Sequence, residues 1–168
     1  TVKADGYQKM AIYYTKTKDF ENFTMPELFF EKACGVFDSH LVKIGDTYHL
    51  FYKTSAEPLM NMHATSNLLF GKWQHDYDFQ KYMQTLYRPG SHEAATTYIL
   101  PDGKWCLMLD FFGCEKEKMG YVPFISEKAG DAHFHQVNQL FSFPYGFKHG
   151  GVIEISDEEY ERLSVSAF

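Results

Sequence analysis

Clusters of basic residues and long apolar runs are both missing from this 168-residue sequence. No run of Lys or Arg exceeds two residues, and the formal net charge is -6 at pH 7. The chain therefore lacks the electrostatic footprint of a protein that binds nucleic acid or an anionic membrane. No apolar run approaches the roughly 20 residues that a membrane-spanning helix needs. We expect neither a nucleic-acid partner nor a membrane partner.

Cysteine is scarce as well, with Cys34, Cys106 and Cys114 the only three. They form no C-x-x-C pair and have no metal-ligand spacing, so we expect free thiols that are buried or half-buried. The G-x-S-x-G motif of serine hydrolases and the glycine-rich phosphate loops are absent too. These gaps argue against a serine or cysteine nucleophile and against nucleotide binding.

Aromatic residues, in contrast, are abundant: they make up 18% of the chain, with 16 Phe and 12 Tyr. Aromatic side chains favour half-buried β-strands, and their flat faces also bind sugars or bases. With 45% hydrophobic residues, the chain is large enough for one compact domain with a buried core. Composition alone leaves the use of these rings open.

An internal repeat organises the chain. Each copy is a strand-like run that ends in polar residues and is followed, after a short polar stretch, by an aromatic residue. The three copies are "MAIYYTKTKDFENFT" (10–24), "MNMHATSNLLFGKWQ" (60–74) and "YVPFISEKAGDAHFHQ" (121–136), with Phe23, Trp73 and Phe134 as the aromatic residues. We expect each aromatic residue to lie on a short outer strand.

A second unit alternates with the first. It consists of a strand headed by an acid, a tight turn and an aromatic strand, as in "FDSHLVKIGDTYHLFYK" (37–53) and "HEAATTYILPDGKWCLMLD" (92–110). The turns Gly45-Asp46 and Asp102-Gly103 between alternating strands predict two hairpins. On this pattern, we expect Asp38 and Glu93 to occupy equivalent places.

Together the two units predict four-stranded sheets, and therefore an all-β chain of β-propeller blades, about three in number. The segment Val152–Ile155 reads as one more strand, and Ser156–Leu163 as the best helix, because a Ser cap precedes acids in its first turn. Since closed propellers usually have about four to eight blades, we expect missing N-terminal blades or a second chain to close the arc.

The innermost strands of a propeller line a central channel, so residues at their starts converge although they are distant in sequence. Asp38, Glu93 and His149 are therefore expected to face one pocket, where two carboxylates can divide acid and base work. The alternative is that the acids cap their own turns and that His149 only packs and forms hydrogen bonds. The residues alone leave both readings open.

Four segments, in this order, resemble the C-terminal part of glycoside hydrolase family 43. They are "YYTKTKDFENFTMPELF", "VFDSHLVKIGDTYHLFYK", "SHEAATTYILPDGKWCLMLDFFG" and "KHGGVIEISDEEYERL". Members of that family are five-bladed propellers that cleave arabinose- and xylose-containing polysaccharides with inversion. The resemblance implies that residues 1–168 are the C-terminal portion of one such catalytic domain, and the export of many members implies a periplasmic or extracellular location.

The resemblance also implies roles for residues. Glu93 would be the general acid, Asp38 the residue that modulates its pKa, and His149 a neighbour of a channel calcium ion; no cofactor is otherwise required. The chain departs from the family where Glu93-Ala94-Ala95 replaces the usual Glu-Gly-Pro, and no segment resembles the strand of the general base. Since a missing general base costs about 10² to 10⁴ in rate, we expect the chain alone to be inactive. The alternatives are a non-catalytic carbohydrate-binding propeller and a protein-interaction propeller.

Overall fold

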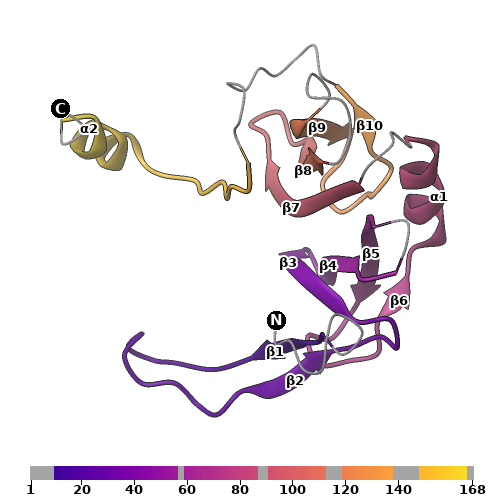
Figure 1. Cartoon of the computed structure of the whole chain (residues 1–168). Helices are drawn as coiled ribbons and strands as arrows, with labels where there is room; N and C mark the ends of the chain where they lie inside the picture. Colours follow the sequence, from indigo (N-terminus) through magenta and orange to yellow (C-terminus); the bar gives the residue numbers. More distant parts are fainter. Residues whose placement is uncertain (1–9, 57–58, 87–90, 113–118, 138–147, 166–168) are drawn as a thin grey trace.

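Three antiparallel sheets follow one another along the chain in a fan (Figure 1). The computed structural model describes residues 10–56, 59–86, 91–112, 119–137 and 148–165. Two of the sheets have four strands and one has two. The all-β prediction and the prediction of incomplete propeller blades are therefore confirmed.

The middle sheet has the order β3-β4-β5-β6. Its strands are β3 (Val36–Ile44), β4 (Thr47–Thr54), β5 (Asn61–Ser66) and β6 (Gln74–His75). The predicted hairpin joins β3 to β4 through Gly45 and Asp46, and Gly45 has the positive φ of 59° that this tight turn requires. Trp73 lies one residue before β6 and not on it, because the outer strand is only two residues long.

The next sheet repeats this plan in the order β10-β9-β8-β7. Its strands are β7 (Ser91–Ile99), β8 (Trp105–Phe112), β9 (Gly120–Ser126) and β10 (His135–Gln136). The predicted second hairpin joins β7 to β8, with Gly103 at a φ of 84°. Phe134 again lies just before the outer strand, where it is buried.

The first repeat copy forms only a two-stranded sheet, β1 (Ile12–Tyr14) paired with β2 (Glu27–Phe30). An isolated bridge between Thr17 and Phe23 extends the same ladder. Phe23 therefore lies in an isolated bridge and not on an outer strand, and it is 56% exposed, whereas Phe134 of the last copy is buried. The described residues thus contain two complete blades and the outer half of a third.

Both faces of the strand β4 are buried, which explains its nearly continuous apolar sequence. Phe51 packs in a core cluster with Trp105, Leu107 and Leu109 of β8, and this cluster joins the two four-stranded sheets. On the opposite face, Leu50 and Tyr52 pack with residues of β1, β2 and β3. Alternate residues of the one strand β4 therefore pack against different neighbouring sheets.

Cys106 is buried and Cys34 half-buried, both as free thiols, as expected; Cys114 lies outside the described residues.

Two helices accompany the sheets. The helix α1 (Tyr77–Thr85) packs beside β5 and buries Phe79 and Met83 in the main core cluster; it was not predicted from the sequence. Asp76 caps it, because its carboxylate accepts a hydrogen bond from the Phe79 amide at 2.9 Å. Neither helix is long and apolar enough to cross a membrane, as far as the described residues extend.

The second helix, α2 (Asp157–Val165), confirms the helix predicted at the C-terminal end. Ser156 and Glu159 form the reciprocal hydrogen bonds of a capping box. The helix buries none of its residues and stands away from the sheets (Figure 1). The strand predicted at Val152–Ile155 is wrong, since this segment is irregular and pairs with none of the strands that the structure describes.

Candidate functional site: a charged cluster at the ends of two blades

The candidate site begins at two matching β-bulges. In the middle sheet, Phe37 pairs with Lys53 and His40 with Phe51, so the two residues Asp38 and Ser39 lie opposite the single residue Tyr52. In the next sheet, Glu93 pairs with Asp110 and Thr96 with Met108, so Ala94 and Ala95 lie opposite Leu109. Both bulges begin with a residue of positive φ, Asp38 at 49° and Ala94 at 51°.

These registers correct the expected equivalence of the two acids. The counterpart of Asp38 is Ala94, and the counterpart of Glu93 is Phe37. A side chain one residue further along a strand points to the other face, but the positive φ of a bulge re-aims it. Asp38 and Glu93 therefore reach the same region from different places in their blades.

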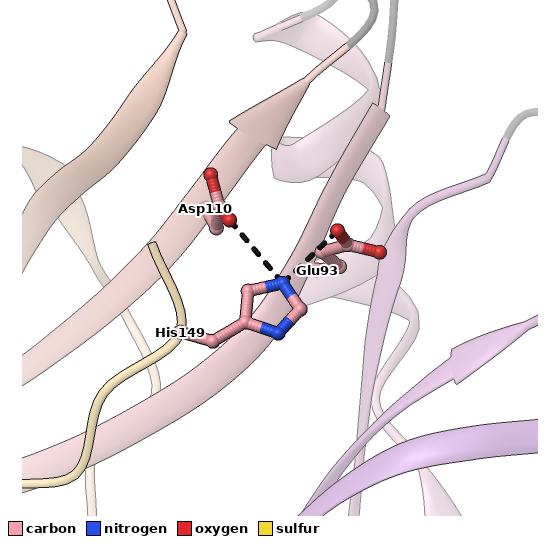
Figure 2. Close-up of side chains that lie close together, drawn as sticks. All are labelled: Glu93, Asp110 and His149. Atoms are coloured by element: carbon pink, nitrogen blue, oxygen red, sulfur yellow. Dashed lines mark hydrogen bonds and ion pairs between the residues drawn. The ribbon is translucent and has the colours of Figure 1, made fainter. Parts of the chain in front are cut away.

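Glu93 lies between two basic groups from different segments. Its Oε2 is 2.6 Å from Nζ of Lys53 on the neighbouring blade, and its Oε1 is 3.0 Å from Nε2 of His149. Figure 2 shows that the same Nε2 also faces Asp110, at 3.2 Å from Oδ2. Because carboxylates only accept when ionised, this arrangement places the imidazole hydrogen of His149 on Nε2.

Asp110, two residues before the end of β8, is the most buried member of this group. Its side chain is fully buried, and Nζ of Lys148 lies 3.5 Å from its Oδ2. We call Lys53, Glu93, Asp110, Lys148 and His149 the charged cluster. It joins two blades to the segment that follows the second one.

Asp38 lies beside the charged cluster in an open cleft of about 370 Å³, which Ala94, Tyr121 and His149 also line. The Tyr121 hydroxyl donates to the Ala94 carbonyl oxygen at 3.2 Å and accepts from the Gly150 amide at 2.5 Å. These bonds attach the segment carrying His149 to the bulge after Glu93. Of the three residues singled out from the sequence, Asp38 and His149 thus line one cleft, and Glu93 lies behind it in contact with His149.

The surroundings raise the pKa of two of the carboxyl groups and lower the pKa of the third. Burial raises the pKa of Asp38, and the negative charge of Glu93 raises it further. Burial also raises the pKa of Asp110, against the opposing charges of Lys148 and His149. For Glu93 the effect of burial is outweighed by the hydrogen bonds from Lys53 and His149, so its pKa is lowered.

The calcium ion implied for His149 can be tested against these residues. One ligand atom from each of Glu93, Asp110 and His149 lies within 4.8 Å of the others, which is close enough for an ion. Calcium, however, takes six to eight oxygen ligands, whereas His149 offers nitrogen and the ammonium groups of Lys53 and Lys148 already face the two carboxylates. The described residues do not fit a directly bound calcium ion.

Sequence reasoning missed Lys53, Asp110, Lys148 and Tyr121. Two of them carried a readable signal, since Lys53 and Asp110 each end an otherwise apolar second strand, "LFYK" and "LMLD". A charge at the end of a buried strand is costly unless it has a partner there. Neither Lys148 nor Tyr121 could be placed without the fold.

Comparison with known families identifies the kind of domain to which the chain belongs. A family model described as a probable glycosyl hydrolase domain, related to glycoside hydrolase family 43, matches residues 2–161. No curated protein matches the chain. Because the match spans nearly the whole sequence, the chain belongs to this family of glycosyl hydrolase-related domains.

Proposed function

We propose that this chain supplies a saccharide-binding cleft, with carboxyl groups for proton transfer, to the inverting hydrolysis of arabinose- or xylose-containing saccharides. The observation that carries the proposal is that Asp38 and His149, from separate segments, line one cleft and that Glu93 contacts His149 beside it. Carboxyl groups with separated pKa values are what glycoside hydrolysis requires.

The roles proposed from the family resemblance are a general acid at Glu93 and a pKa-modulating residue at Asp38. In the complete enzyme, Glu93→Gln should abolish hydrolysis of substrates with poor leaving groups and spare activated aryl glycosides more, because the latter need little proton donation. Equal losses on both substrates would contradict the acid role. Glu158→Gln, on the exposed helix α2, is the matched control.

A general base is not among the residues we assign, so the 168-residue chain is expected to bind saccharides without turning them over. The experiment is calorimetric titration with arabino- and xylo-oligosaccharides, run beside a hydrolysis assay with 4-nitrophenyl arabinofuranoside and xyloside. We expect binding that Glu93→Gln weakens, and no release of 4-nitrophenol. Ordinary turnover by the isolated chain would refute the claim that it lacks a general base, and absence of binding would refute the claim that the cleft binds saccharides.

A non-catalytic carbohydrate-binding propeller is the second candidate. The contact of Glu93 with Lys53 favours it, because a carboxylate held ionised by an ammonium group at 2.6 Å is a poor proton donor. The two functions differ in the complete protein: a binding module shows no turnover of either aryl glycoside.

A partner that closes the arc belongs to the same proposal. The half-blade β1–β2 supports it, since the other two sheets have four strands each. Missing N-terminal blades or a second chain would supply the remaining strands. Light scattering distinguishes these sources, because only the second makes the isolated chain a dimer.

A further inference from the structure

Lys53 is an unusual residue for the interior of a sheet. Its side chain is only 4% exposed, and an ammonium group is almost never buried without a partner. The ring of Phe112 lies 4.3 Å from Nζ and the ring of Phe37 lies 5.1 Å from it, so two aromatic faces flank the charge. Among the described residues, the one carboxylate within ion-pair distance is Glu93.

Glu93 is correspondingly restrained. Its two oxygens have separate partners, Lys53 on Oε2 and His149 on Oε1, and its side chain is 17% exposed. Protonating Glu93 would leave the buried ammonium of Lys53 without a counter-charge, which is costly inside a protein. The contact therefore fixes both the position and the charge of this carboxylate.

Asp38 has the opposite surroundings. Its side chain makes no hydrogen bond or ion pair with any of the described residues, and it lines the open cleft. Burial raises the pKa of Asp38, and the nearby negative charge of Glu93 raises it further, against the opposing effects of Lys53 and His149. A proton shared by this pair is therefore cheaper on Asp38 than on Glu93.

We propose that Lys53 is a positioning residue that holds Glu93 beside the cleft as an ionised, hydrogen-bond-accepting carboxylate and leaves Asp38 as the one of the two carboxyl groups that takes up a proton first as the pH falls. The inference rests on the saccharide cleft of the proposed function and deepens its second candidate, the non-catalytic one, in which Glu93 need not donate a proton. Glu93 then accepts hydrogen bonds from saccharide hydroxyl groups, and Asp38 donates one only where the pH is low enough to protonate it. This division of roles is the reverse of the one that the family resemblance implies.

The test is a pH titration of the carboxyl carbons by NMR on the full chain, without saccharide. In the unmodified protein we expect the midpoint of Glu93 to lie below that of Asp38. Lys53→Met should raise the midpoint of Glu93 by about one pH unit or more, because it removes an opposite charge in direct contact. Lys53→Arg should keep the midpoint of Glu93 below that of Asp38, because it retains the positive charge. If Lys53 had only a structural role, the midpoint of Glu93 would not depend on the charge at this position.

Two further variants keep the test decisive if Lys53→Met fails to fold. Glu93→Gln removes the negative charge beside Asp38 and should lower the midpoint of Asp38. Lys43→Met, at an exposed position of β3, is the matched control and should move neither midpoint. The proposal is overturned if Asp38 titrates below Glu93 in the unmodified protein, or if Glu93 keeps its midpoint in a folded Lys53→Met.

The NMR titration and the saccharide titration can fail independently, so the inference and the proposed function are tested separately. If the midpoints behave as expected and saccharide titration gives no heat, the charge assignment stands and the saccharide cleft falls. If saccharides bind but the midpoints are reversed, the cleft stands and Lys53 loses its role.

Discussion

Mild acid should destabilise this protein through two buried histidines. His49 is 2% exposed and His92 is 5% exposed. Burial lowers the pKa of both to about 4, helped by the charge of His63 for His49 and by that of Lys53 for His92. Neither ring can take up a proton in the folded state until the pH falls well below the ordinary histidine range.

The sign and size of the effect follow from linkage. In the unfolded chain a histidine has a pKa of about 6.5, so between pH 6.5 and 4 the unfolded state binds a proton that the folded state does not. The free energy of unfolding then falls by about 1.4 kcal/mol per pH unit for each ring. From pH 6.5 to 4.5 each ring contributes a loss of about 2 to 3 kcal/mol, and above pH 6.5 the stability is fully present.

The assay is urea unfolding followed by circular dichroism at pH values from 7 to 4.5, compared between the unmodified protein and His49→Phe. Phenylalanine keeps a ring against Trp105 and His63, whose centroids lie 4.9 and 5.2 Å from that of His49, but it cannot titrate. The comparison is needed because the raised pKa values of Asp38 and Asp110 act in the opposite direction in both proteins.

We expect the acid-induced loss in His49→Phe to be smaller by about 2 to 3 kcal/mol. His135→Phe, at an exposed position of β10, is the matched control and should follow the unmodified protein. Parallel stability curves for His49→Phe and the unmodified protein would refute the reasoning, because they would mean that His49 takes up its proton equally in the folded and unfolded states.

Two further predictions concern the sheets. Phe51→Ala should lower the free energy of unfolding by about 3 to 5 kcal/mol in urea, because it opens a cavity where the two blades meet, whereas Leu68→Ala at a 69% exposed site should change it little. Gly103→Ala should cost about 1 to 2 kcal/mol, since its φ of 84° suits only glycine, and Gly151→Ala, which has no positive φ and meets no atoms, should be near neutral by the same measurement.

The blades could be predicted from the sequence because their determinants are local. The alternation of side chains, the turn at Gly45-Asp46 and the turn at Asp102-Gly103 each act within a few residues, and the repeat shows the same pattern twice. The helix α1 was missed for a physical reason. It is nine residues long, and packing of Phe79 and Met83 stabilises it more than any periodic pattern indicates.

The site could be predicted only in part. Asp38 and Glu93 were found because acids at strand starts are rare and need a reason, and His149 because it precedes the apolar segment Val152–Ile155, which was expected to be a strand. The one-residue error between Asp38 and Glu93 arose because a bulge adds a residue to one strand of a pair, and a sequence pattern does not show which residue is the extra one. Lys148 depends on long-range contacts that no local pattern contains.

Lys53 and Asp110 occupy equivalent positions in two blades but carry opposite charges. Lys53 pairs with Phe37 in one sheet, and Asp110 pairs with Glu93, the counterpart of Phe37, in the next. If both positions carried an acid, Glu93 would have two like charges as neighbours and no counter-charge in the buried layer. The lysine in the first blade instead neutralises Glu93 across the blade boundary, while Asp110 meets Lys148 and His149 from the following segment. The charge at this position is therefore opposite in the two blades.

Lys53→Asp should consequently destabilise the protein more than Lys53→Met, because it adds a buried negative charge beside Glu93 and also removes its partner.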